Sequence, residues 1–188
     1  DIWNQTQGSE GGFVFCDGEK EKNISKELVC IFNPFELDFN EKKILTKLYQ
    51  ELQGQANDCF FNEGLELNSK ILVYLENILN KVPYSLEYNV DFDVNFLLKM
   101  YGVRVQCYGE SLLEKIIEYV RIMSQICNVR TMVFVGLKQY LDIMELRQLY
   151  EFVFYEKINL VIIEAIHSVG ISGEKCWILD KDLCIIDL

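Results

Sequence analysis

The chain has 188 residues, of which 50% are hydrophobic and only two are proline, and its formal net charge at pH 7 is −11. This composition predicts a folded domain, or a domain with a large insertion, and excludes a disordered chain. The acidic excess argues against capture of nucleic acid by bulk charge, but it leaves room for a local basic face and favours divalent cations. No stretch approaches the roughly 18 consecutive apolar residues of a membrane span, so we expect no membrane segment.

Cysteine usage points to a reducing compartment. The seven cysteines include no C-x-x-C pair, so we interpret them as reduced, mostly buried thiols of a cytoplasmic protein. A single histidine, His167, argues against both a catalytic cysteine and a zinc site. We find no signal peptide, and because the chain opens with Asp1 instead of Met, we expect its natural N-terminus to be trimmed or left out.

The first part of the chain alternates apolar strands with one amphipathic helix. A short strand is expected at 13–15, and an apolar strand at 28–32 has the composition of a strand covered on both faces. Asp38 and Glu41 form an acidic variant of a capping box, and we expect the helix that follows to end at Gly54. Its apolar face consists of Ile44, Leu45, Leu48, Tyr49 and Leu52.

Three lysines share the opposite side of this helix. Lys42, Lys43 and Lys47 can form one outward stripe. Most surface lysines are simply solvated. The alternative is contact with the phosphate groups of a nucleic acid, for which these three lysines are the first candidates.

Residues 64–127 are expected to form an all-helical insertion in an α/β frame. The predicted elements are a helix over 71–82 closed by Pro83, a helix over 91–101, a strand-like patch over 103–108, and a long helix opened by a Ser111-x-x-Glu114 capping box. We therefore predict an α/β head at 1–63 and 128–188, with a parallel sheet, carrying a helical projection at 64–127.

An acidic segment follows Pro83. Glu87, Asp91 and Asp93 are consistent with acids that complement the dipole of the next helix. A glycosidase pair would need a carbohydrate-lined cleft, which nothing in the sequence indicates. As hard oxygen ligands these carboxylates suit calcium, although they lack the spacing of an EF-hand.

A strand, a helix and a second strand follow the insertion. The strand over 131–136 and the strand over 159–165 are expected to be parallel, with a right-handed crossover and an Asp142-x-x-Glu145 cap on the helix between them. We expect the tail to add one last short strand. The helix residues expected to face the sheet are Ile143, Leu146, Tyr150, Val153 and Phe154.

The phosphate loop of nucleotide-binding sheets is missing. Where it should follow the first strand, the chain reads "VFVGLKQYL", with one glycine, Gly136, then Lys138 and the bulky Tyr140. A phosphate loop needs several glycines and a lysine followed by serine or threonine, so that backbone N–H groups can surround the phosphate. We interpret Gly136 as a tight turn and expect no nucleotide hydrolysis and no enzymatic activity.

The order of these patterns resembles the Csn-two family of type II-A CRISPR systems, the accessory subunit for acquiring new spacers. The similarity runs from about residue 28 to the C-terminus and rests on hydrophobic patterns in the same order. The passages are "ELVCIFNPFELDFNEKKILTKLY", "LEYNVDFDVNFLLKMYGVRVQ", "SLLEKIIEYVRI", "RTMVFVGLKQYLDIMELRQLYEFVFYEKINLVIIEA" and "WILDKDLCII".

The resemblance implies a head with a sheet like a degenerate P-loop NTPase core, an α-helical leg, and assembly into a homotetrameric ring. Members bind the ends of double-stranded DNA through the central hole, and they associate with the spacer integrase and the effector nuclease. They need calcium for the shape of the ring, and we carry calcium ligation over to Glu87, Asp91 and Asp93.

The chain departs from the family in two places. It lacks the strand and helix with which the family begins, and it has Tyr88, Asn89 and Val90 where the family is more acidic. Two other functions stay open. One is a protein–protein adaptor without DNA binding, and the other is a divergent nucleotide hydrolase.

Overall fold

The computed structural model describes residues 2–166, 170–180, 182 and 184–187, so His167 lies outside the described residues. The chain forms two compact units. The first unit consists of Asp1–Phe39 and Gln106–Leu188, and the second of Asn40–Val105. The described residues include no helix long and apolar enough to cross a membrane.

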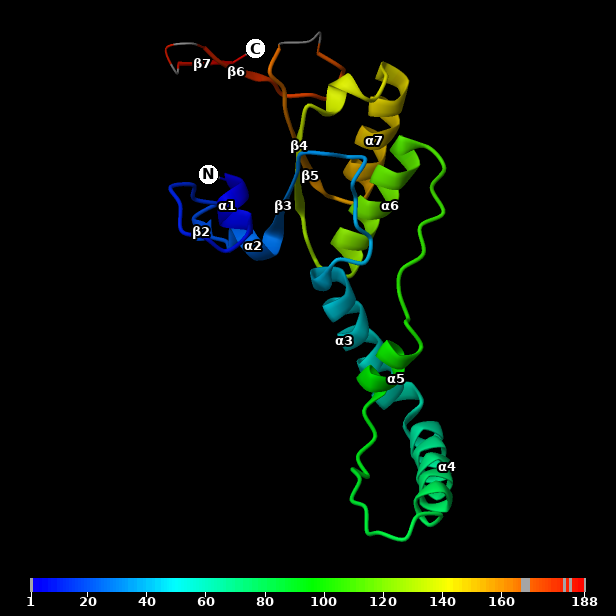
Figure 1. Cartoon of the computed structure of the whole chain (residues 1–188). Coiled ribbons are helices and arrows are strands. Elements are labelled where there is room, and N and C mark those ends of the chain that lie inside the picture. Colours follow the sequence, from blue (N-terminus) through cyan, green and yellow to red (C-terminus); the bar gives the residue numbers. More distant parts are fainter. Residues whose placement is uncertain (1, 167–169, 181, 183, 188) are drawn as a thin grey trace. The chain divides into compact units, whose positions relative to one another are not determined.

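A three-stranded parallel sheet forms the centre of the first unit (Figure 1). Its strands are β3 (Leu28–Ile31), β4 (Thr131–Val135) and β5 (Asn159–Ile163), in the order β3-β4-β5. The middle strand β4 is buried over its first four residues, as an apolar strand between two others should be. The predicted parallel sheet is confirmed.

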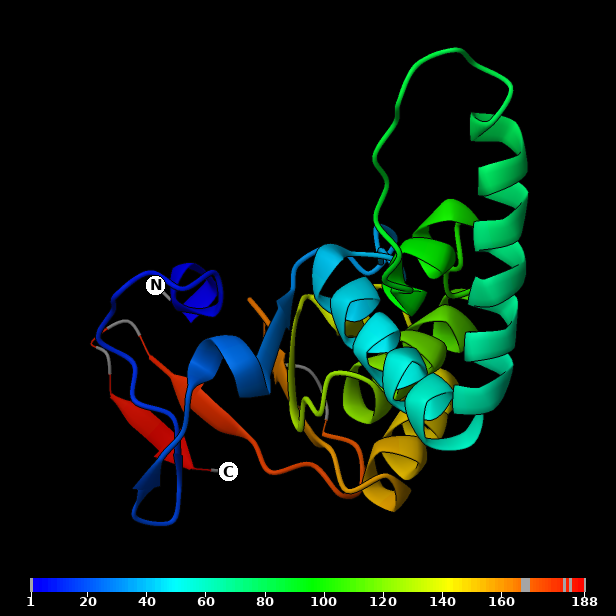
Figure 2. The same ribbon diagram turned by 90° about the horizontal axis from the view of Figure 1, so that it is seen from below.

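Two helices cover the same side of this sheet, α6 (Leu112–Gln125) and α7 (Ile143–Tyr155) (Figures 1 and 2). This placement follows from right-handed crossovers that both progress in one direction across the sheet. Both helices begin with the predicted capping boxes, in which the N-cap side chain and the Glu three residues later each bind a backbone N–H; the pairs are Ser111 with Glu114 and Asp142 with Glu145.

The buried face of α7 differs from the predicted one. Leu146, Leu149 and Val153 are buried, whereas Ile143 and Phe154 are exposed, so those two predictions were wrong. The three buried residues follow the i, i+3, i+7 spacing of a single narrow stripe. Leu149 belongs to this stripe because it lies three residues after Leu146 and four before Val153.

The ends of the first unit form small elements. At the N-terminus these are α1 (Ile2–Thr6), β1 (Cys16–Asp17), β2 (Lys20–Glu21) and α2 (Ile24–Glu27). The prediction of a strand at 13–15 is therefore wrong, because strand pairing begins only at Cys16. There, two strands of two residues each form a short antiparallel hairpin. The single strand expected in the tail is an antiparallel pair, β6 (Trp177–Leu179) with β7 (Ile185–Asp187), which forms a sheet of its own.

The second unit contains α3 (Lys42–Cys59), α4 (Phe61–Leu79) and α5 (Val94–Met100). The Asp38–Glu41 capping box is wrong, because Glu41 is itself the N-cap residue and makes no side-chain cap bond. Helix α3 also continues through Gly54, which costs only about 1 kcal/mol relative to Ala and does not end a helix by itself. Residues 103–108, predicted as a strand-like patch, form no strand.

Side-chain hydrogen bonds hold the two ends of the second unit together. The Asn40 amide donates to the Val105 carbonyl at 3.0 Å and accepts from the Val105 N–H at 2.8 Å. The Tyr49 hydroxyl donates to the Val103 carbonyl at 2.9 Å. The chain therefore enters and leaves this unit at adjoining points.

The unit boundaries differ from the predicted ones at both ends. Residues 40–63 belong to the second unit, and residues 106–127 belong to the first. The reason for the second shift is the burial of α6, whose apolar face includes the fully buried Ile116, Val120 and Met123. The all-helical block predicted over 64–127 thus contains one helix that belongs to the sheet.

The cysteines are free, but most are not buried as predicted. Cys127 alone is buried, while Cys16, Cys59 and Cys184 are exposed. Cys107 is half-buried, and its thiol donates to the Glu118 carboxylate at 3.2 Å. Burial, and then this hydrogen bond, raise the pKa of the Cys107 thiol, which keeps it protonated and poorly nucleophilic at neutral pH.

Candidate functional site

The carboxyl edge of the parallel sheet is where ligands bind in open α/β folds. Here β4 ends at Val135, and Gly136 turns the chain with φ of 71° into a single 3-10 turn, Leu137–Gln139. A side chain at Gly136 would be strained at that φ, and its Cβ would meet the Gln139 amide at 3.1 Å. The sequence interpretation of Gly136 as a tight turn is confirmed.

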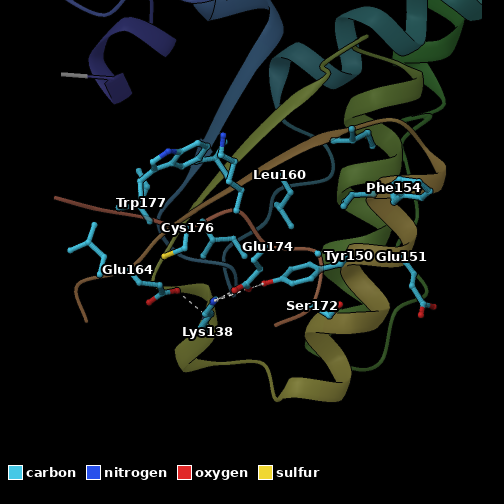
Figure 3. Close-up of a pocket in the computed structure, with 18 of the residues that line it drawn as sticks. Lys138, Tyr150, Glu151, Phe154, Leu160, Glu164, Ser172, Glu174, Cys176 and Trp177 are labelled. Atoms are coloured by element: carbon cyan, nitrogen blue, oxygen red, sulfur yellow. Dashed lines mark hydrogen bonds and ion pairs between the residues drawn. The ribbon is translucent and has the colours of Figure 1, made fainter. Parts of the chain in front are cut away.

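Lys138, in that turn, lies in a network of carboxylates (Figure 3). Its ammonium is 2.8 Å from Oε1 and 2.9 Å from Oε2 of Glu174, and its backbone N–H donates to Oε1 of Glu164 at 2.8 Å. Tyr150, from α7, donates its hydroxyl to Oε1 of Glu174 at 2.5 Å, and the Ile171 N–H donates to Oε2 at 3.1 Å. Each oxygen of Glu174 therefore accepts from two donors.

The charges in this network stabilise one protonation state. Burial alone would raise the pKa of the Glu174 carboxyl, but the hydrogen bonds from Lys138, Tyr150 and Ile171 outweigh it and lower that pKa. Burial, and then the hydrogen bond to Glu174, raise the pKa of the Tyr150 hydroxyl well above its usual value. At neutral pH the network therefore consists of a carboxylate and a neutral phenol beside the lysine.

An open groove of about 1110 Å³ adjoins the network. It is lined by α7, by β5, and by the segment 172–179. Lys138, Tyr150 and Glu174 lie on its wall together with apolar side chains such as Leu160 and Ile162. The groove thus combines an apolar lining with a few convergent polar groups, as small-molecule sites do.

The three predicted DNA-binding lysines lie in the first two turns of α3. Lys42 and Lys47 are exposed, and Lys43 is half-buried. Ile44, in the same turns, is fully buried. Lys42 lies across the helix from Ile44, whereas Lys47, three residues after Ile44, lies on the same side as it, so the three lysines do not form one stripe opposite the buried side. This places three cations within two helical turns.

The predicted calcium ligands lie in and beside a segment without helix or strand. Glu87 and Asp91 are exposed, whereas Asp93 is half-buried and caps α5 by accepting from the Asn95 N–H at 2.8 Å. Within the described residues, no three His, Cys, Asp or Glu side chains come together as metal ligands. The three carboxylates therefore do not form a ready-made calcium site in this chain.

Sequence reasoning missed the Glu174 network. It noted Lys138 and the lack of a phosphate loop, but Glu174 is 36 residues further along the chain. No spacing rule connects the two residues. The only hint was the position of a lysine just beyond the carboxyl end of a buried strand.

Comparison with known proteins decides the family. Residues 5–183 match the family described as CRISPR-associated protein (Cas_Csn2). The chain belongs to this family. Two proteins called CRISPR-associated protein Csn2 are similar to it. The one from Streptococcus agalactiae is 23% identical over 89% of the chain and 76% of its own length. The one from Enterococcus faecalis is 22% identical over 79% and 72%.

A solved structure shares the fold of this Cas_Csn2 chain. The crystal structure of Stu0660 of Streptococcus thermophilus matches with a TM-score of 0.54 and 11% sequence identity, over 86% of the chain. The chain spans 58% of that solved chain. At this identity the match supports the fold alone.

The lowered pKa of Glu174 makes one pH dependence testable in this Cas_Csn2 chain. A carboxyl whose folded pKa is lowered stabilises the protein above its unfolded pKa and loses that contribution as the pH falls. We expect Glu174→Gln to lower the free energy of unfolding by about 1–3 kcal/mol at pH 7. The difference from wild type should shrink as the pH falls below 4.5.

Urea unfolding at several pH values measures this difference. Glu151→Gln is the matched control, because Glu151 lines the same groove but is exposed. A Glu174→Gln effect of the same size at pH 7 and pH 3 would contradict the stabilising role of the ionised carboxylate.

Proposed function

We propose that this chain is an accessory factor in CRISPR spacer acquisition that binds the ends of linear double-stranded DNA as a homotetrameric ring. Membership of the Cas_Csn2 family supports a role in CRISPR defence. The observation that carries DNA binding is the group of three lysines in the first two turns of α3, Lys42, Lys43 and Lys47, of which Lys42 and Lys47 are exposed. Phosphate contacts of this kind fix position without reading sequence.

Assembly is needed to make such a group of lysines effective. A chain with a net charge of −11 should repel a duplex, and three lysines make few phosphate contacts. A ring would gather the lysines of several copies and multiply weak contacts by the copy number. The second unit has apolar side chains that an assembly could cover, since Phe96, Met100 and Tyr101 are 71%, 71% and 75% exposed.

A protein–protein adaptor without DNA binding is the second candidate. The same exposed aromatic side chains favour it, because aromatic residues and Met are enriched in protein interfaces. The spacer integrase complex and the effector nuclease are the partners we propose in either case. A cytoplasmic location is part of this proposal, and the seven free cysteines are compatible with it.

The proposed role of the sheet is that of a scaffold, without enzymatic activity. In a phosphate loop, a lysine and successive backbone N–H groups bind the phosphates. Here the Lys138 ammonium pairs with Glu174, and the Lys138 N–H binds Glu164. Two carboxylates therefore hold the donors that a nucleotide would need.

The group of three lysines predicts a specific loss of DNA affinity. Lys42→Ala, Lys43→Ala and Lys47→Ala together should weaken binding equally for unrelated duplex sequences. The slope of log K against log salt should flatten by about 0.9 for each DNA phosphate that the variant no longer neutralises. Fluorescence anisotropy over a series of salt concentrations measures both.

The matched control removes the same charge from the same unit. Lys70, Lys81 and Lys99 are exposed lysines outside α3, and their triple alanine variant should keep the wild-type slope. An unchanged slope in the α3 variant, together with a flattened slope in the control, would move the DNA-binding surface elsewhere. Absence of DNA binding by the wild-type chain at low salt would favour the protein–protein adaptor function.

A ring that threads DNA should distinguish the topology of its ligand. We expect tight binding to linear duplex and weak binding to a closed circle of the same sequence, because a circle offers no end to enter. Competition between the two forms, with the oligomeric state followed by light scattering, measures this. Equal affinity would refute threading, and binding by isolated monomers would refute the ring requirement.

The absence of catalysis is testable at Lys138. We expect ATP turnover at background level, since the turn after β4 does not leave its lysine and N–H groups to a triphosphate. Release of phosphate from ATP in the presence of magnesium measures it. Turnover that exceeds background in wild type and disappears in Lys138→Ala would support the hydrolase alternative.

Calcium remains a proposal for the assembled protein. The segment that carries Glu87 and Asp91 has no helix or strand, so its backbone can rearrange around an ion without breaking the hydrogen bonds of an element. A ligand that binds only the native state stabilises it by about 2.7 kcal/mol at a hundredfold excess over its Kd. We expect calcium to raise the Tm, and Asp91→Asn with Asp93→Asn to remove most of that rise. An unchanged rise would place the ion elsewhere.

A further inference from the structure

The environment of Glu174 is that of a bound oxyanion. Its two oxygens accept from the Lys138 ammonium, the Tyr150 hydroxyl and the Ile171 N–H. The Lys138 and Glu174 side chains are only 17% and 16% exposed. Three donors of different kinds therefore converge on one carboxylate that is largely shielded from water, and such charge-assisted bonds are the strong ones.

The Glu174 carboxylate lies where open α/β folds bind a ligand. Lys138 follows β4 by three residues, at the carboxyl edge of the sheet where open α/β folds bind their ligands. Glu174 reaches this edge from a loop beyond β5, in a segment that also lines the groove. The anion at this site thus belongs to the chain itself and lies on the wall of an open groove.

We propose that Lys138, Tyr150 and the Ile171 N–H form an oxyanion-binding site that the chain closes with its own Glu174, and that phosphate is the class of ligand the site takes when Glu174 is removed or displaced. Glu174 then acts as an internal competitor. The apparent affinity of a site that is rarely open falls by the fraction of open molecules. Wild type should therefore bind phosphate poorly, although all the donors are in place.

Removing the carboxylate should open the site. Glu174→Ala removes the acceptor that the three donors share, and a free oxyanion can take its place. Inorganic phosphate is the probe, with sodium chloride at equal ionic strength as the blank. Acetate, a carboxylate like the one removed, serves as a second probe.

We expect phosphate to bind the full-length Glu174→Ala chain at least tenfold more tightly than wild type by calorimetry. At tenfold excess over its Kd, it should raise the Tm of the variant by roughly 3–6 °C. Glu174→Ala with Lys138→Met should lose this response, because the cation is gone. Glu151→Ala removes an exposed carboxylate from the same groove and should bind phosphate as wild type does.

Three outcomes would overturn the proposal. One is a folded Glu174→Ala chain that binds neither phosphate nor acetate. Another is equal phosphate affinity in wild type and Glu174→Ala. The third is an equal gain in Glu151→Ala, which would trace the effect to net charge alone.

Folding of the variant is itself informative. Should Glu174→Ala unfold, Glu174→Ser keeps a small polar side chain at the position, and circular dichroism reports its folding. Recovery of folding by phosphate or acetate in either variant supports the site. Variants that stay unfolded with both anions would show that a free oxyanion cannot replace Glu174, and the proposal would fall.

Discussion

Parallel pairing of β4 with both of its neighbours is the constraint on which the first unit depends. Strands that run in the same direction cannot be joined by a tight turn, so each pair needs a crossover that returns the chain to the same end of the sheet. The crossover from β4 to β5 is the single helix α7. The crossover from β3 to β4 contains α6 and the whole second unit. The two parallel strand pairs therefore require the two long crossovers of this chain.

The same constraint places side chains from distant parts of the sequence at one edge. Parallel strands all end at the same side, so the residues that follow β4 and those that follow β5 become neighbours. Lys138 and Glu164 meet there for that reason. Open α/β folds bind ligands at this edge, and in this chain two carboxylates, Glu164 and Glu174, bind the donors of Lys138 there.

Local patterns predicted the parts of the fold that depend on local physics. The two capping boxes, at Ser111 and Asp142, were predictable because each is a bond between residues three apart. The middle strand β4 was predictable because its burial leaves a continuous hydrophobic run. Gly54 was misleading, because a glycine ends a helix only where the chain must adopt a left-handed turn, and α3 continues straight into its next turns.

The parts that could not be predicted depend on contacts between distant residues. Nothing in the periodicity of α6 distinguishes a helix that covers a sheet from one that belongs to a helical insertion, so the boundary at residue 106 needed the structure. The candidate site has the same character. The three lysines at the start of α3 are close together in the sequence, but the partnership of Lys138 with Glu174 joins residues that no local rule connects.

The Asn40 amide that binds both backbone groups of Val105 has a consequence for how the chain tolerates change. Because the chain enters and leaves the second unit at adjoining points, the length of this unit does not fix the distance between β3 and β4. The entropy of closing a loop also grows only slowly with its length, so each doubling costs about 0.6 kcal/mol. Insertions, deletions and surface substitutions within residues 41–104 should therefore leave the folding of the sheet unaffected. A short linker that replaces these residues should yield a minimal version of the first unit.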